Sequence, residues 1–175
     1  VCIVINGKTL PHSDKLVTRL IETVSDDLKT VVLNFNTADT NVVMSTNCKA
    51  IYGNGYITDL LCGVKVRLNP LSFYQVNHTM AERLYNKAAE FAGNGGTLID
   101  LYCGAGTIGL SMADRFDNVI GVEVIPEAVE DAKANAAANG ITNARFICAD
   151  AYEAAKQLHS EGIKPEVVIV DPPRK

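Results

Sequence analysis

A glycine-rich segment and two acidic residues form the clearest chemical pattern in this sequence. The run Gly104-Ala105-Gly106-Thr107-Ile108-Gly109 matches G-x-G-x-x-G and directly follows an expected strand. Asp100 lies just before this run, and Glu123 closes the next expected strand. Glycines at this spacing let the backbone approach a bound nucleotide closely, and an acid at the second strand end binds ribose hydroxyls. The pattern predicts a nucleotide-type cofactor at these strand ends.

The charge of Asp100 favours one class of cofactor over another. In NAD, a pyrophosphate lies against the glycine turn, and a carboxylate at ~4–6 Å repels it. S-adenosylmethionine has no phosphate and carries an ammonium and a sulfonium, so the same carboxylate becomes favourable. Glu123 is then expected to bind the ribose, and Asp150, after the third expected strand, to meet the adenine amino group. We therefore expect S-adenosylmethionine as the cofactor, with NAD as the alternative.

The same residues also have purely structural interpretations. Asp100 can cap the turn that follows it, and the glycines can serve only the packing of a helix on the sheet. Asp150 stands directly before Ala151, where it is also a good helix N-cap. These alternatives stay open on the sequence alone.

Helices and strands alternate in the second part of the chain. Expected helices lie at about 77–92, from Thr107, and at 126–139 and 151–158, and expected strands lie at 97–101, 118–122, 144–148 and 166–170. This order predicts an α/β domain with a doubly wound, Rossmann-like parallel sheet, whose ligand lies beyond the carboxyl ends of the strands. Function is therefore expected near residues 100–106, Glu123, Asp150 and Asp171.

The first part of the chain has a different pattern. A helix is expected at 16–28, and short β-branched runs predict strands at 1–5, 30–36, 41–44, 57–61 and 64–68. This pattern is typical of a small α+β domain with antiparallel strands. We place the domain boundary near Pro70, with an α+β central domain at 1–69 and the N-terminal part of a cofactor-binding domain at 70–175.

The overall composition limits the possible partners. The chain has 175 residues, 16 Lys and Arg against 20 Asp and Glu, and a net charge of -4, so any RNA contact is expected to be local. No apolar run reaches the ~20 residues of a membrane span. The 5 cysteines form no C-x-x-C pair, which indicates a reducing cytoplasm and no zinc site. We expect a cytoplasmic monomer without a metal, and both chain ends are expected to be cut from a longer protein.

Three segments together resemble a known enzyme family. They are Ser72-Phe73-Tyr74-Gln75-Val76-Asn77, residues 100–106, and Asp171-Pro172-Pro173-Arg174. From about Tyr52 to Lys175 the chain is similar to the RNA (uracil-5-)-methyltransferases, and the first segment is the most specific mark. The resemblance implies S-adenosylmethionine-dependent methylation of uridine C5 in RNA, with 23S ribosomal RNA favoured over transfer RNA. It also implies that the central domain contacts RNA.

The resemblance implies roles for individual residues. By this resemblance the cofactor-contact positions are Gln75, Tyr102, Thr107, Glu123, Asp150 and Asp171. The loop pattern described above adds Asp100, Gly104 and Gly106 as expected cofactor-binding residues. Thr107 departs from the Asn that some members have there. Arg174 is expected to bind the substrate, since a guanidinium can hold a phosphate or the uracil edge.

The family chemistry requires residues that lie elsewhere. A cysteine thiolate adds to uracil C6, and C5 then takes the methyl group from the cofactor. A base removes the C5 proton, so that the S–C6 bond breaks and the thiolate is released. In the family this Cys and a Glu base lie beyond the Asp-Pro-Pro-Arg motif, and thus beyond Lys175. Cys103 lacks a nearby cation that would stabilise a thiolate. We therefore expect no catalytic residue within these 175 residues, and an inactive fragment.

Three alternatives to the ribosomal RNA enzyme remain. The first is a transfer RNA uracil-5-methyltransferase. The second is an amino-methyltransferase acting on guanine or adenine, whose Asn/Asp-Pro-Pro-aromatic motif has Arg174 in place of the aromatic residue. The third is a module that binds cofactor or RNA without chemistry of its own.

Overall fold

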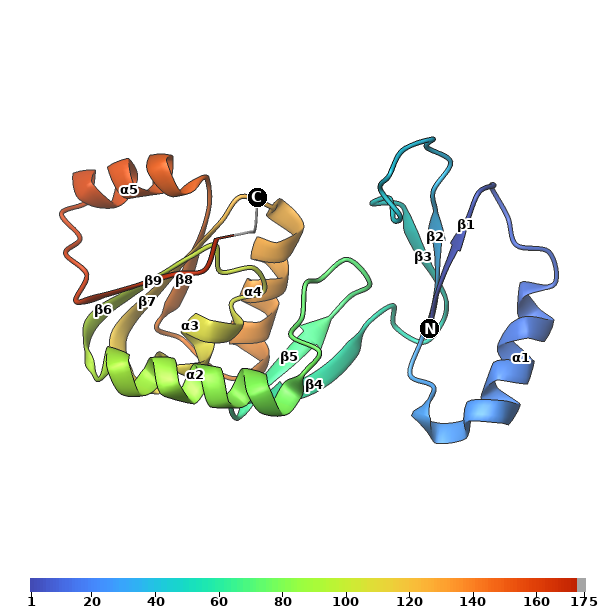
Figure 1. Ribbon diagram of the computed structural model, residues 1–175, viewed down its shortest axis with the longest axis horizontal. Helices are drawn as coiled ribbons and strands as arrows, with labels where there is room; N and C mark the ends of the chain where they lie inside the picture. Colours follow the sequence, from blue (N-terminus) through green and yellow to red (C-terminus); the bar gives the residue numbers. More distant parts are fainter. Residues whose placement is uncertain (173–175) are drawn as a thin grey trace. The chain divides into compact units, whose positions relative to one another are not determined.

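The computed structural model describes residues 1–172, which form two compact units (Figure 1). The first unit contains Val1–Thr58 and Leu68–Leu71, and the second contains Asp59–Arg67 and the chain from Ser72 onward. The predicted domain boundary near Pro70 stays a prediction. No helix within residues 1–172 is both long enough and apolar enough to cross a bilayer.

The first unit is a three-stranded sheet with one long helix. Its elements are β1 (Cys2–Ile5), α1 (Ser13–Val24), the 3-10 turn η1 (Ser25–Asp27), β2 (Val31–Phe35) and β3 (Cys48–Tyr52). β2 is the central strand, with β1 parallel and β3 antiparallel to it. The expectation of purely antiparallel strands is therefore wrong, because the α1 crossover returns the chain to the end of the sheet where β1 began.

The strand expected at residues 41–44 is also wrong. Val42 and Val43 are exposed and lie in a loop, and their carbonyl groups accept hydrogen bonds from the Asn36 side-chain amide at 2.7 and 3.0 Å. Asn34 Nδ2 donates to the carbonyl oxygen of Ser45 in the same loop at 2.6 Å. Side-chain amides thus satisfy this segment's carbonyls, and β3 pairs with β2 instead.

A short hairpin follows the first sheet in the chain. β4 (Ile57–Leu61) and β5 (Val64–Leu68) form a two-stranded sheet. The turn between them consists of Cys62 and Gly63, both in the left-handed region, with φ 49° and 79°. Two residues with positive φ make the turn whose twist matches that of a hairpin.

The second unit carries a parallel sheet with strand order β8-β7-β6-β9. Its further elements are α2 (His78–Ala92), β6 (Gly95–Leu101), α3 (Thr107–Ser111), the 3-10 turn η2 (Ala113–Arg115), β7 (Phe116–Glu123), α4 (Pro126–Ala138), β8 (Ala144–Cys148), α5 (Ala151–Ser160) and β9 (Val167–Val170). All three strand pairs are parallel. The expected doubly wound α/β fold is therefore confirmed, with the strand order reversing beside β6.

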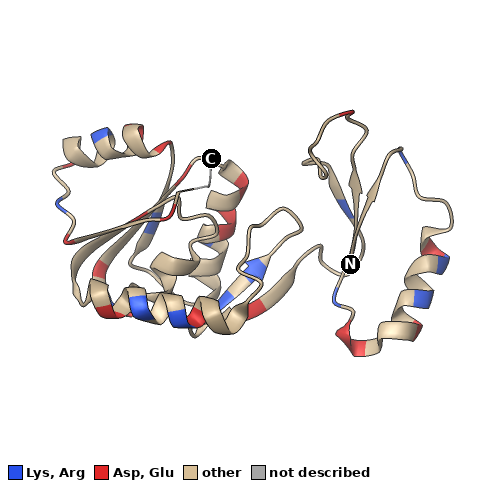
Figure 2. Cartoon of the chain, viewed as in Figure 1, with Lys and Arg blue, Asp and Glu red and all other residues tan. Residues whose placement is uncertain are grey.

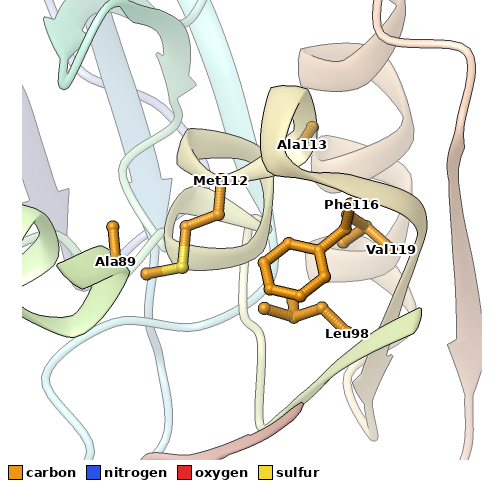
Figure 3. Close-up of a cluster of buried hydrophobic side chains, with 6 residues drawn as sticks. All are labelled: Ala89, Leu98, Met112, Ala113, Phe116 and Val119. Atoms are coloured by element: carbon orange, nitrogen blue, oxygen red, sulfur yellow. The ribbon is translucent and has the colours of Figure 1, made fainter. Parts of the chain in front are cut away.

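Both faces of this sheet are covered by helices (Figure 1). On one face, Leu98 and Val119 pack with Met112, Phe116 and Ala89 in a buried cluster (Figure 3). On the other face, Ile99, Ile120 and Val122 pack against Ala154 and Leu158 of α5. Successive residues of a strand point to opposite faces, so one apolar run supplies both cores. Because both faces of the sheet are covered, a ligand is expected to bind beyond the carboxyl ends of the strands.

Candidate cofactor-binding site

The glycine loop between β6 and α3 has an unusual backbone. Tyr102, Gly104 and Gly106 all have positive φ angles of 64°, 54° and 79°. A Cβ at Gly104 would meet no atom within 4 Å, whereas at Gly106 it would lie 3.0 Å from Phe146 Cε1 and 3.2 Å from Ala132 Cβ. Gly106 is therefore required by packing beneath the loop, and Gly104 borders open space.

Glu123 fixes the loop from the end of β7. Its Oε2 accepts a hydrogen bond from the Gly104 N–H at 3.0 Å, and its Oε1 accepts from Val124 N–H at 2.8 Å and Ile125 N–H at 2.9 Å. A carboxylate has about four acceptor positions, so about one stays available for a hydroxyl. Glu123 can thus bind a ribose oxygen while it holds the loop.

Asp150 is the N-cap of α5. Its Oδ1 accepts from Tyr152 N–H at 2.9 Å and from Glu153 N–H at 3.0 Å. The capping interpretation of Asp150 is therefore confirmed. Its side of the helix also borders a cavity, so capping does not exclude contact with a ligand.

A cavity of about 280 Å³ lies at the carboxyl ends of β7 and β8. It is lined by Tyr102, Val122, Glu123, Val124, Ala149, Asp150, Ala151 and Tyr152. Small-molecule pockets begin at roughly 300 Å³, so the size suits part of a nucleoside. Tyr102, Glu123 and Asp150, three residues expected in the site, therefore share one cavity.

Asp100 lies beneath the loop and not in the cavity lining. The residue is 1% exposed, and its Oδ2 accepts from Gly109 N–H at 2.9 Å. Its Oδ1 is buried without a hydrogen-bond partner among the described residues. Burial, with a smaller contribution from nearby Asp171, raises the pKa of this carboxyl to about 7, although the Gly109 hydrogen bond acts to lower it. Asp100 thus caps the turn and also leaves one buried oxygen unused, while its expected contact with a cofactor stays a prediction.

The remaining expected residues lie outside the cavity lining. Thr107 begins α3, and its Oγ1 lies 3.2 Å from the hydroxyl of Tyr85. Gln75 is half-buried in an irregular segment that leads into α2, and Asp171 is exposed just after β9. Arg174 lies outside the described residues. The roles of these four residues stay predictions.

The Gln75 segment is attached to its surroundings through its neighbours. Tyr74 donates its hydroxyl to Asp59 Oδ2 of the hairpin at 2.8 Å, and burial together with this bond raises the pKa of Tyr74. Ser72 Oγ donates to Asp131 Oδ2 of α4 at 3.2 Å. Two residues just before Gln75 therefore attach this segment to the hairpin and to α4.

Sequence reasoning missed three residues around the site. Tyr152 lines the cavity, and Lys156 Nζ lies 4.1 Å from the centre of its ring. Tyr85 is buried beside Thr107, and Asn135 is a buried amide of α4. No pattern in the sequence distinguishes the two tyrosines from ordinary helix residues. Asn135 is a polar residue in the Ala-rich run of α4, but this position does not indicate its partners.

Cys103 is a poor candidate nucleophile. Its side chain is buried, and burial raises the pKa of its thiol, as do the nearby Asp100 and Glu123. A thiolate is the reactive form of cysteine, and this environment disfavours it. Within residues 1–172 no cluster of His, Cys, Asp or Glu has the arrangement of a metal site.

The fold and the site define a class, the Rossmann-like methyltransferase domains. Among solved structures, the tRNA (uracil-54, C5)-methyltransferase of Pyrococcus abyssi, in complex with S-adenosyl-L-homocysteine, aligns with a TM-score of 0.76 and 26% identity. The alignment covers 98% of this chain and 39% of that one. The M. jannaschii tRNA m1G37 methyltransferase aligns with a TM-score of 0.57 over 99% of this chain and 51% of that one, but at 13% identity this likeness concerns the fold alone.

Sequence comparison gives the family. The model of the tRNA (uracil-5-)-methyltransferase family matches residues 22–175, and the chain belongs to this family. An uncharacterized RNA methyltransferase of Caldanaerobacter subterraneus subsp. tengcongensis is 45% identical over 174 residues, which are 98% of this chain and 38% of that relative. The chain thus spans 38% to 39% of the length of the curated relatives it matches.

Proposed function

We propose that these residues form the S-adenosylmethionine-binding part of an RNA uracil-C5 methyltransferase. The observation that carries the proposal is the cavity shared by Tyr102, Glu123 and Asp150 beside the open face of Gly104. The family match over residues 22–175 supports the reaction class, and the P. abyssi relative binds S-adenosyl-L-homocysteine.

The residues present fit this cofactor. The apolar walls of the cavity and its two tyrosines suit a purine ring, and Asp150 lies where an exocyclic amino group can donate to it. Glu123 keeps about one acceptor position for a ribose hydroxyl. The buried Oδ1 of Asp100 has no hydrogen-bond partner among the described residues and lies beneath the loop. The cofactor supplies an electrophilic methyl group when it is bound.

The same geometry argues against NAD. A dinucleotide site uses backbone N–H groups of the glycine turn to hold the pyrophosphate. Here the Gly104 N–H already donates to Glu123, and Asp100 lies beneath the turn. The Glu123 carboxylate therefore already uses a loop N–H that a pyrophosphate would need, which supports a cofactor without phosphate groups.

We propose uridine in RNA as the substrate. The family description and the P. abyssi relative both name transfer RNA, whereas the preference for ribosomal RNA stays a prediction. Figure 2 shows Lys and Arg interspersed with Asp and Glu along α1 and α2, which supports local rather than extended phosphate contacts. The substrate-binding role of Arg174 is part of this proposal.

Calorimetric titration of the chain with two ligands tests the cofactor. We expect S-adenosylhomocysteine to bind and NADH to give no heat of binding, because only the first lacks a pyrophosphate. Binding of NADH without binding of S-adenosylhomocysteine would overturn the assignment.

A further inference from the structure

Asn135 of α4 and Asn139, the C-cap of this helix, both contact the edge of the hairpin strand β5. Asn139 accepts from Lys65 N–H at 2.8 Å and donates its amide to the Lys65 carbonyl, also at 2.8 Å. One turn earlier, Asn135 Oδ1 accepts from Arg67 N–H at 2.8 Å. Residues i and i+4 share a helix face, and alternate residues of a strand present their N–H groups to one edge. The helix therefore takes the place of a neighbouring strand for β5.

Only one of these two asparagines also contacts the glycine loop. Asn135 Nδ2 donates to the carbonyl oxygen of Ala105 at 3.1 Å, whereas the Asn139 amide donates to Lys65 and to the Asn135 carbonyl. Asn135 is 1% exposed, and its bond to Ala105 is buried, whereas its bond to the exposed Arg67 is part-buried. A single buried side chain thus connects the hairpin with the middle of the loop.

Glu123 holds the loop at Gly104, and Asn135 holds it one residue further along, at Ala105. Gly104 and Gly106 have no side chains, and both use the left-handed region. Ala105 is buried between them, and Asn135 is the donor to its carbonyl oxygen among residues 1–172, so removal of Asn135 leaves this carbonyl without a protein donor there. A buried carbonyl without a donor is unfavourable, so the loop is expected to leave its present conformation.

We propose that Asn135 is a positioning residue that sets the glycine loop for cofactor binding. It acts through Ala105, which fixes Gly104 at the open edge of the site and Gly106 against Ala132 and Phe146. The inference rests on the proposed function, because it concerns the affinity of the same site. Asn135 itself does not line the cavity, and its side chain is held by a hydrogen bond from Arg67 of β5.

The test compares Asn135→Ala with the matched control Asn139→Ala. Each variant loses contacts with the edge of β5, but only the first loses the bond to Ala105. The readouts are the affinity for S-adenosylhomocysteine, the melting temperature, and the hydrogen-exchange rates of the Gly104 and Gly106 amides without ligand. Asn135→Asp is a second variant that keeps the acceptor for Arg67 and loses the donor for Ala105.

The expected results separate positioning from stability. Both alanine variants lower the melting temperature, but only Asn135→Ala and Asn135→Asp weaken binding, by about tenfold, and speed exchange at Gly104 and Gly106. Unchanged affinity and exchange in a folded Asn135 variant, or equal effects in Asn139→Ala, overturn the inference. If the unaltered chain does not bind S-adenosylhomocysteine, the proposed function fails, and the exchange rates alone then decide the role of Asn135.

Discussion

Glu123 Oε2 accepts a hydrogen bond from the backbone N–H of Gly104 at 3.0 Å, so the acid at the end of β7 holds the glycine loop after β6. Its other oxygen accepts from Val124 and Ile125 at the start of the connection to α4. An acid at this position is expected to bind ribose, and here it also shapes the loop that borders the site.

This double role predicts two effects of Glu123→Ala. The affinity for S-adenosylhomocysteine should fall more than tenfold, about 1.4 kcal/mol or more, because a ribose contact and the loop geometry are both lost. The melting temperature should fall as well, since three backbone donors lose their acceptor. Calorimetry and thermal unfolding measure the two effects.

Glu127→Ala is the matched control for this experiment. Glu127 is an exposed acid in the first turn of α4 and does not line the cavity. Its removal should leave the affinity within about twofold, because it contributes only a small charge–dipole term. Equal losses of affinity in both variants would contradict a specific role for Glu123.

Gly121→Ala should destabilise the second unit strongly. An added Cβ would lie 2.5 Å from Phe146 Cδ1 and 2.8 Å from Cys103 Sγ, so β7 or its neighbours must shift. Overpacking of this kind costs about 1–3 kcal/mol of unfolding free energy. Urea unfolding measures the loss, and Phe146→Leu in the same chain should recover part of it. A Gly121→Ala variant as stable as the unaltered chain would contradict the close packing of Phe146 and Cys103 against Gly121.

Asp100 should make stability depend on pH. Its folded pKa is raised by burial to about 7 from 3.8, so the folded state keeps a proton that the unfolded state releases between these values. The free energy of unfolding should therefore fall as the pH rises from about 4 to about 7, by an amount on the order of a few kcal/mol. Asp100→Asn should remove this slope and be more stable than the unaltered chain at pH 8. If the free energy of unfolding had the same pH dependence in the two proteins, the claim that Asp100 is buried and protonated would be refuted.

Gln75 and Asn77 should separate cofactor binding from helix capping. The Asn77 side chain accepts from Met80 N–H at the start of α2, so Asn77→Ala should lower the unfolding free energy by about 1 kcal/mol without changing affinity. Gln75→Ala should weaken S-adenosylhomocysteine binding and leave the melting temperature unchanged. A lowered melting temperature with unchanged affinity in Gln75→Ala would favour a structural role for this amide.

The 175-residue chain should transfer no methyl group to RNA. Uracil C5 becomes nucleophilic only after a thiolate adds to C6, and burial raises the pKa of Cys103, the cysteine of the cofactor loop. A radiolabelled methyl-transfer assay on unmodified ribosomal and transfer RNA should give no signal. The full-length relative from Caldanaerobacter subterraneus, of which this chain covers 38%, should label uridine C5 in the same assay. Label from the 175-residue chain, or label on a nitrogen from the full-length relative, would exclude this mechanism.

The sequence predicted the parallel sheet because each of its elements has a local signature. Pro126 begins α4 and Glu127 lies in its first turn, and Gly140 follows its end with φ 66°. The ends of such strands then gave Glu123 and Asp150 as neighbours. The structure adds two facts that the sequence did not predict. Glu123 and Asp150 line the same cavity, and Glu123 accepts a hydrogen bond from Gly104 N–H.

Long-range pairing explains what the sequence did not predict. The sequence predicted a strand at 41–44 instead of β3. The Asn34 and Asn36 side chains donate hydrogen bonds to backbone carbonyls of the loop before β3, and such contacts leave no periodic pattern in the sequence. Asn135 contacts Ala105 across 30 residues and Arg67 across 68 residues of the chain. A helix position gives no signal for partners at these separations, so its role follows from the fold alone.

A crystal structure of the chain with S-adenosylhomocysteine tests the central claim most directly. The adenine should occupy the cavity of about 280 Å³ between Tyr102 and Tyr152, with a ribose hydroxyl on the free acceptor position of Glu123. The Gly104 N–H should still donate to Glu123 in the complex. A ligand bound elsewhere, or an adenine outside this cavity with Glu123 free of the ribose, would contradict the proposed cofactor site.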